Sequence, residues 1–245
     1  MVRRHGRIGS TTGAAIHARP GAVVVDIFDE VEQDLQAERT ARLLRKYGWV
    51  LIAAAVLVVA GTAAWQAWRW HEDRLDAAAA HAYMAASRTA TPAGAVAATA
   101  QAKAAALAQF QALATDGTPG YRVLARLRAA ALLADAGNLA AASVLWDDVA
   151  HDAAAGPLLQ GLATLTWAQH HVDTGDAAAV AARLQPLMAP ADPWHALAEE
   201  TQAALDLRQG HKDAARTMLQ RLQADTGAPD GVRGRAGELL AKLGE

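Results

Sequence analysis

The chain has 245 residues, a formal net charge of −2 and no cysteine. A nearly balanced charge is not that of a nucleic-acid-binding protein, which gathers phosphates on a basic face. The lack of cysteine excludes disulfides, thiolate metal sites and cysteine nucleophiles from these residues.

The N-terminal segment divides at Asp26. Residues 1–25 have scattered Gly, Arg, Ser and Thr without an apolar period, which predicts a disordered tail. From Asp26 to residue 46, apolar residues recur at helical spacing, Asp26 can cap, and acidic side chains precede basic ones as the helix dipole favours. We expect an amphipathic helix over 26–46, whose apolar stripe could rest on lipid headgroups, contact another protein or simply be solvated.

An uncharged run of 22 residues follows, from Tyr47 to Trp68. As a helix it would be about 33 Å long, enough to cross a hydrocarbon core of about 30 Å. Tryptophans lie at both ends, where an aromatic belt is expected. Basic residues are more frequent before the run than after it, and this bias predicts a single-pass protein with residues 1–46 in the cytoplasm and 69–245 across the membrane. The flanking residues are Trp49, Trp65, Trp68 and Trp70, with Arg39, Arg42, Arg45 and Lys46 before the run and Arg69 and Arg74 after it.

Two other interpretations of residues 47–68 stay open. One is a signal peptide cleaved near residues 60–64, although the apolar core exceeds the usual length of about 7–15 residues and 46 residues precede it. The other is a buried core helix of a soluble protein. Gly61 is tolerable within lipid and could mark close packing against a partner helix.

The region 69–245 is rich in alanine and has no strand-type runs of Val, Ile, Thr and aromatic residues, which predicts an all-α domain. We expect a helix over Arg74–Arg88, a break at TATPAG, a helix over Ala95–Ala114 and a turn at TDGTPG. Further helices follow, separated by turns.

Three of these turns form a repeat. They contain Gly137, Gly175 and Gly210, which are 38 and 35 residues apart, close to the period of about 34 residues of tetratricopeptide helix pairs. Each glycine can adopt the left-handed conformation that ends a helix. This spacing predicts a helical-repeat solenoid, with an irregular helical bundle as the alternative.

The residues around the three glycines also share a register. Small residues lie seven before and five after each glycine, and large apolar residues lie nine after it. We expect the small residues to let two antiparallel helices approach closely, and each large residue to be buried between its own helix pair and the next. In order of these three offsets, the sets are Ala130, Ala168 and Ala203; Ala142, Val180 and Ala215; and Trp146, Leu184 and Leu219.

One acidic segment invites a search for a metal site. Asp147 and His151 lie four residues apart and could share a metal ion, with Asp148 and Asp152 nearby. Two ligands on one helix face do not close a coordination shell, and no H-E-x-x-H motif is present. A solvated, charged helix face is the interpretation that we favour, and we predict no metal.

Catalysis has no positive support elsewhere. His170 and His171, with Asp173, lie at a helix end, where cationic side chains suit the helix dipole. Glu199 and Glu200 are adjacent on a helix, so their carboxylates diverge. Nucleophile-elbow and phosphate-loop motifs are absent. We predict no catalytic or cofactor-binding residue and no cofactor, and the sequence identifies no protein-binding residue.

Several segments, in their order, resemble the membrane-anchored, tetratricopeptide-like family of ancillary SecYEG translocon subunits. They are DIFDEVEQDL, RLLRKYGW, the three glycine turns, YRVLARLRAAALLADAG and PWHALAEETQAALDLRQGHKDAARTMLQRL. The aromatic residue expected early in each first helix is replaced by Arg126, Thr164 and Glu199, so the repeats are degenerate. The resemblance implies a bacterial inner-membrane protein whose periplasmic repeats work beside the secretion channel and periplasmic chaperones.

These observations lead us to expect a non-enzymatic scaffold that binds proteins through its repeats and takes no small-molecule substrate. One alternative is a regulator that holds a cytosolic factor on the helix 26–46 and responds to the state of envelope proteins. Another is an anchored hydrolase or metalloenzyme, which would need a third ligand near Asp147 and His151.

Overall fold

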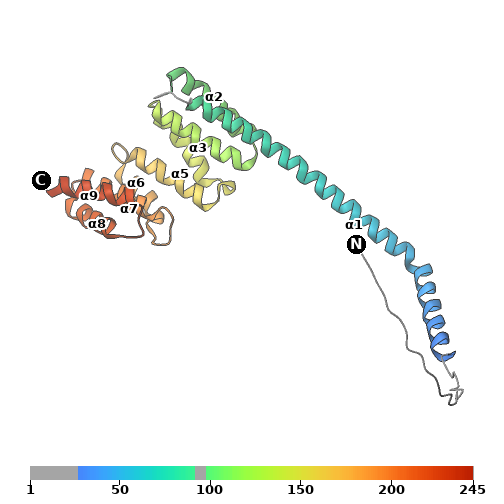
Figure 1. Cartoon of the computed structure of the whole chain (residues 1–245). Helices are drawn as coiled ribbons and strands as arrows, with labels where there is room; N and C mark the ends of the chain where they lie inside the picture. The colour runs from blue at the N-terminus through green and yellow to red at the C-terminus, as the bar shows by residue number, and fades with distance from the viewer. Residues whose placement is uncertain (1–26, 92–97, 245) are drawn as a thin grey trace, which may run out of the picture. The chain divides into compact units, whose positions relative to one another are not determined.

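The computed structural model describes residues 27–91 and 98–244, with side chains from Arg45 onward. Within these ranges the chain is helical and has no strand (Figure 1). The predicted tail 1–25 and the predicted cap Asp26 lie outside the described residues. The elements are α1 (Ile27–Ala90), α2 (Ala100–Asp116), α3 (Pro119–Asp135), α4 (Leu139–His151), η1 (Ala153–Ala155), α5 (Gly156–His171), α6 (Ala177–Leu184), η2 (Gln185–Met188), α7 (His195–Arg208), α8 (Lys212–Ala224) and α9 (Asp230–Gly244).

The first helix is longer than the sequence predicts. The expectation of a separate helix over Arg74–Arg88 was wrong, since these residues are part of the 64-residue α1. No glycine or proline separates Trp68 from Arg74, so nothing there interrupts the helical hydrogen bonds. The part of α1 from Arg45 onward contains a stretch of mean hydropathy 2.0, long and apolar enough to cross a membrane, and none of that stretch is buried in the chain. A buried core helix is therefore not supported.

The second helix differs from expectation at both ends. It begins at Ala100 rather than Ala95, with residues 95–97 outside the described part, and it ends at Asp116 rather than Ala114. The side chain of Thr99 caps it, accepting a hydrogen bond of 3.2 Å from the amide of Ala102. A side-chain acceptor for one of the free amides of the first turn explains why the helix starts there.

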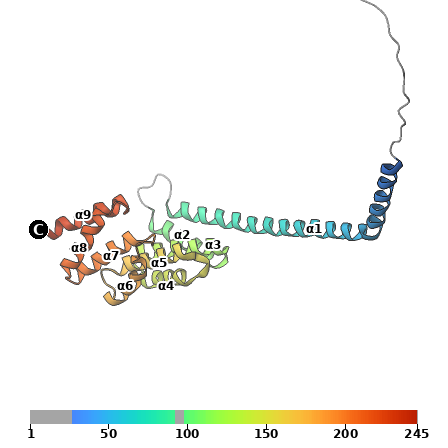
Figure 2. The same ribbon diagram turned by 90° about the horizontal axis from the view of Figure 1, so that it is seen from below.

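From α2 to α9, each helix packs on the next one in the sequence, and α5 also contacts α7 as α7 contacts α9. Figures 1 and 2 both show these helices following one another in sequence order. Contacts between sequence neighbours and between next-but-one helices are what stacked antiparallel helix pairs produce.

Two of the three repeat turns end their first helix in the same way. Gly137 and Gly210 have φ of 81° and 82°. At the first turn, the amide of Asn138 donates to the carbonyl of Leu133 at 2.8 Å and that of Gly137 to Ala134 at 2.9 Å. These are the two hydrogen bonds of a Schellman motif, and the third turn repeats them.

The middle turn corrects the sequence-based expectation. The φ of Gly175 is not in the left-handed region. Its amide instead donates to the carbonyl of His171 at 2.8 Å. A Cβ at this position would lie 2.7 Å from that same oxygen, closer than real Cβ contacts. Glycine is needed here for close backbone approach rather than for a positive φ.

The predicted repeat register is confirmed, because all nine positions are buried. Eight of them have a relative exposure of 0%, and Trp146 has 1%. The three large residues fill the predicted gaps. Trp146 stacks on His170 of the following pair, Leu184 shares a buried cluster with Leu205 of α7, and Leu219 shares another with Val232 of α9.

Alanine makes up much of this core. Of the 30 buried hydrophobic residues in the described part, 15 are alanine. Their small side chains let the helix backbones approach closely, so the larger residues fill the spaces between helices at a limited number of points.

Candidate protein-binding surface

The structure corrects the view of Asp147 as part of a merely solvated face. Its carboxylate accepts a hydrogen bond from Arg183 of α6 and forms an ion pair with it. The ring Nδ1 of His151 lies 2.8 Å from the backbone carbonyl oxygen of Asp147, not from its carboxylate. The sequence did not reveal this ion pair because its partners are 36 residues apart.

The neighbouring Asp152 is also paired. Arg126 of α3 donates to its Oδ2 at 2.8 Å, and both side chains are three-quarters buried. Arg126 is one of the three residues that replace the expected aromatic, so the position holds an inter-helix ion pair instead of a ring. In the described part of the chain, no three His, Asp or Glu side chains form a group that could hold a metal ion.

The two adjacent histidines pack as structural residues. His170 stacks on Trp146 with ring centroids 4.9 Å apart, and His171 stacks on Trp167 at 4.0 Å. The Nδ1 of His171 lies 2.7 Å from the carbonyl of Trp167, and its Nε2 lies 3.2 Å from Ser143 Oγ. These contacts join α4 to the end of α5.

The two adjacent glutamates have different partners, as their spacing predicts. Glu199 is buried and lies 3.9 Å from His195 and 3.7 Å from Arg221. Glu200 accepts two hydrogen bonds from Arg235 of α9, at 2.5 and 2.6 Å. The hydrogen bond with Glu200 raises the pKa of the Arg235 guanidinium. The carboxylates therefore connect helices and do not face one pocket.

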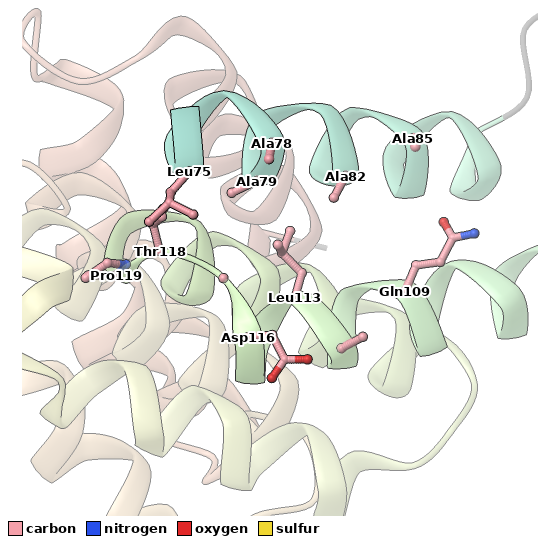
Figure 3. Close-up of a pocket in the computed structure, with 12 residues that line it drawn as sticks. Leu75, Ala78, Ala79, Ala82, Ala85, Gln109, Leu113, Asp116, Thr118 and Pro119 are labelled. Carbon is pink, nitrogen blue, oxygen red and sulfur yellow. The ribbon is translucent and has the colours of Figure 1, made fainter. Parts of the chain in front are cut away.

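An open groove of about 760 Å³ lies within the repeat domain. One wall is the C-terminal part of α1, and the other is the end of α2 with the turn into α3. We call it the α1/α2 groove. The α1 wall consists of Leu75, Ala78, Ala79, Ala82 and Ala85, and the facing wall includes Gln109, Ala112, Leu113, Asp116, Thr118 and Pro119 (Figure 3).

The packing of α1 on its neighbours fixes the groove. Tyr83 lies against Phe110 at 5.4 Å between ring centroids and against Tyr121 of α3 at 6.0 Å. Ala79 and Ala86, one turn away on either side, are buried in the same cluster. This face of α1 is held on α2 and α3, while the adjacent stripe, with Ala78, Ala82 and Ala85, stays exposed along the groove.

The groove is mostly apolar, and its polar lining side chains are Gln109, Asp116 and Thr118. Asp116 is exposed, and its carboxylate forms no ion pair with any described residue. The hydroxyl of Thr118 is buried and has no hydrogen-bond partner among the described residues. Thr118 precedes α3 without capping it through its side chain.

The sequence prediction missed this groove. The repeat was found from the three glycine turns, and the connection from α1 to α2 is not one of those turns. The available signal was the spacing of Leu75, Ala78, Ala82 and Ala85, which places them along one helix face. In an alanine-rich chain that spacing alone does not distinguish an open wall from a buried one.

The family comparison agrees with this architecture. The model of the tetratricopeptide repeat-like domain matches residues 42–228. The chain belongs to this family. The match includes the apolar segment as well as α2 to α8, and it indicates no catalytic family. Repeat domains of this kind present extended surfaces that bind other proteins.

No curated protein and no solved structure matches the chain.

Proposed function

We propose that this protein is a non-enzymatic scaffold anchored in the bacterial inner membrane by residues 47–68, with its repeats in the periplasm. The repeats bind other proteins there, beside the secretion translocon and periplasmic chaperones. The fold supports the scaffold role, since stacked helix pairs give a long surface without a chemical centre.

One observation carries the anchoring proposal. α1 holds an apolar stretch of which nothing is buried, and the same helix supplies Ala79, Tyr83 and Ala86 to the repeat core. An apolar helix surface of this length left in water would be strongly unfavourable, and lipid would cover it. The family match also spans both parts.

The orientation rests on the flanking charges. Four basic residues precede Tyr47 closely, while Arg69 and Arg74 follow Trp68. In short segments such a bias keeps the more basic side in the cytoplasm. The translocon and chaperone partners rest on the resemblance, which covers about Val25 to Leu243.

Reporter fusions test the topology. A reporter that is active only in the periplasm is expected to be active after Glu245 and inactive before Asp26. A reporter that is active before Asp26 and inactive after Glu245 would overturn both the orientation and the proposed partners. Loss of the apolar segment by cleavage near residues 60–64 would show as a shortened mature chain, and would overturn the anchor.

Crosslinking in native membranes tests the partners. We expect translocon subunits or periplasmic chaperones to be crosslinked to the repeat domain, and deletion of residues 1–40 to leave these crosslinks unchanged. If the deletion abolishes function while the repeats stay folded, the regulatory alternative replaces the scaffold.

A further inference from the structure

We propose that the α1/α2 groove binds an amphipathic helix of a second protein, with large aliphatic side chains on one face and a Lys or Arg that reaches Asp116. This inference rests on the proposed scaffold function and specifies the chemistry of one partner.

The two ends of the repeat stack differ. At the C-terminal end, α9 packs on α8 and supplies Val232 and Ala236 to a buried cluster with Leu219. At the N-terminal end, the exposed stripe of α1 and the end of α2 border the open groove. Terminal faces of repeat arrays need a cap, because each helix pair leaves an apolar face for its neighbour. A helix in the α1/α2 groove would supply the cap that α9 supplies at the other end.

The groove walls suit a helix. Ala78, Ala82 and Ala85 recur at intervals of three and four residues along α1, and Ala112 lies on the α2 wall. Walls of such small residues let another helix backbone come close, as small residues do wherever helices pack tightly. The volume of about 760 Å³ then accepts the larger side chains that these walls lack.

The negative charge of the groove favours a partner that carries a basic residue. Among the described residues, Asp116 is the one ionisable side chain that lines it, and no basic residue does. Nearby on α1, the exposed acids Glu72, Asp73 and Asp76 outnumber the exposed bases Arg69 and Arg74, so this stretch adds net negative charge. A lipid headgroup would bring its phosphate close to Asp116, with no basic residue among the described groove-lining residues to receive it. A helix with a basic residue complements Asp116 instead.

The test uses the full chain in nanodiscs of phosphatidylethanolamine and phosphatidylglycerol. The probe is a fluorescent synthetic helix of about 15 residues, near the length at which isolated helices become stable, with leucines at i, i+3, i+4 and i+7 and one lysine. Ala82→Trp fills the groove and is expected to weaken binding at least tenfold. Ala182→Trp, at an exposed alanine of α6 that does not line the groove, is the matched control and is expected to leave the affinity unchanged.

The charge contact has its own test. Asp116→Asn is expected to weaken binding of the lysine probe by about two- to fivefold, as for a partly exposed ion pair, and to leave a norleucine version of the probe unaffected. Asp173→Asn, at an exposed aspartate in the middle turn, is the control. Equal loss for both probes would refute the role of Asp116.

The location of the probe is measured by crosslinking. Because the chain has no cysteine, Ala82→Cys carries a single photocrosslinker, with Ala182→Cys on α6 as the control. Crosslinks to the probe from position 82 alone support the proposal. Position 82 could instead crosslink to a second copy of the chain. If Ala82→Trp then abolishes both these crosslinks and the dimers, the occupant is a second copy. Quenching of a fluorophore at position 82 by nitroxide lipids would make the occupant a lipid. Either of these results, or equal probe binding by Ala82→Trp and Ala182→Trp, overturns the proposal.

Failure of this inference is separable from failure of the scaffold proposal. If the groove variant and its control bind the probe equally, while the reporter topology and the partner crosslinks are as expected, only the groove inference is refuted. A cytoplasmic Glu245 would overturn the scaffold proposal while probe binding to the groove stayed measurable.

Discussion

Arg183 of α6 donates a hydrogen bond to the carboxylate of Asp147 on α4, joining the second helices of two successive repeats. The Arg183 guanidinium also lies 3.7 Å from the centroid of the Trp167 ring on α5. One side chain therefore connects three helices, through an ion pair and a cation–π contact.

We predict that this side chain contributes to stability despite its partial exposure. Arg183→Ala removes both contacts and is expected to lower the free energy of unfolding by about 1–2 kcal/mol, while Asp147→Asn removes the ion pair and costs about 0.5–1 kcal/mol after solvent screening. Thermal unfolding of the full chain in detergent, followed by circular dichroism, measures both. The neighbouring Asp148 is exposed, and Asp148→Asn is expected to stay within about 0.5 kcal/mol. An Asp147→Asn protein as stable as this control would show that the pair contributes nothing.

The repeat register gives a larger expected effect. Leu184 has no exposed surface, so Leu184→Ala removes buried contacts and leaves a cavity, at a cost of about 2–5 kcal/mol. Leu158 is 54% exposed, and Leu158→Ala is the matched control with an expected loss below about 1 kcal/mol. Denaturant midpoints of the two variants give the comparison. Similar losses at both positions would contradict the inter-repeat packing of Leu184.

Two glycines outside the core should respond to alanine in opposite directions. At Gly137, the φ of 81° is unfavourable for alanine, so Gly137→Ala is expected to lower stability by about 1–2 kcal/mol. Gly120 lies in α3, where an added methyl group would meet no other atom within 4 Å, and Gly120→Ala should raise stability by about 0.5–1 kcal/mol. Melting temperatures test the sign of each change. Stabilisation by Gly137→Ala would refute the left-handed helix end.

The apolar stretch of α1 can be tested independently of topology. Arg at both Val56 and Val59, which are 60% and 66% exposed, should cost roughly 2.5–3.5 kcal/mol each near a membrane centre. We expect weaker insertion or a displaced span, measured by carbonate extraction and reporter fusions. The matched control is Arg at Ala105 and Ala108, two exposed residues of α2 with the same spacing. Normal insertion of the Val56→Arg, Val59→Arg protein would remove the basis for a membrane span.

Local patterns predicted the repeats well because their cause is local. A glycine that ends a helix and the residues at fixed offsets from it determine which side chains meet when two helices fold back on each other. Ala130, Ala142 and Trp146 could therefore be assigned to the core from one turn, and their burial follows.

What the sequence did not reveal depends on contacts between distant residues. Asp147 and Arg183 are 36 residues apart, and Arg126 and Asp152 are 26 apart. The sequence around either aspartate therefore does not identify its partner. The role of Gly175 depends on how closely the backbone at His171 approaches it, which spacing does not encode. The α1/α2 groove depends on how Tyr83 packs α1 against Phe110 and Tyr121, and this too is a contact between distant residues.

The alanine-rich core makes the domain's response to mutation asymmetric. Half of the buried apolar residues have only a methyl group, and these positions have little volume to lose and no room to gain any. Enlarging Ala130 or Ala168 would force two helices apart, whereas truncation is damaging only at the other half of the core, where the side chains are larger. During divergence, such a domain would hold its small residues more tightly than its large ones, because a leucine can be exchanged for a methionine where an alanine can be exchanged for almost nothing.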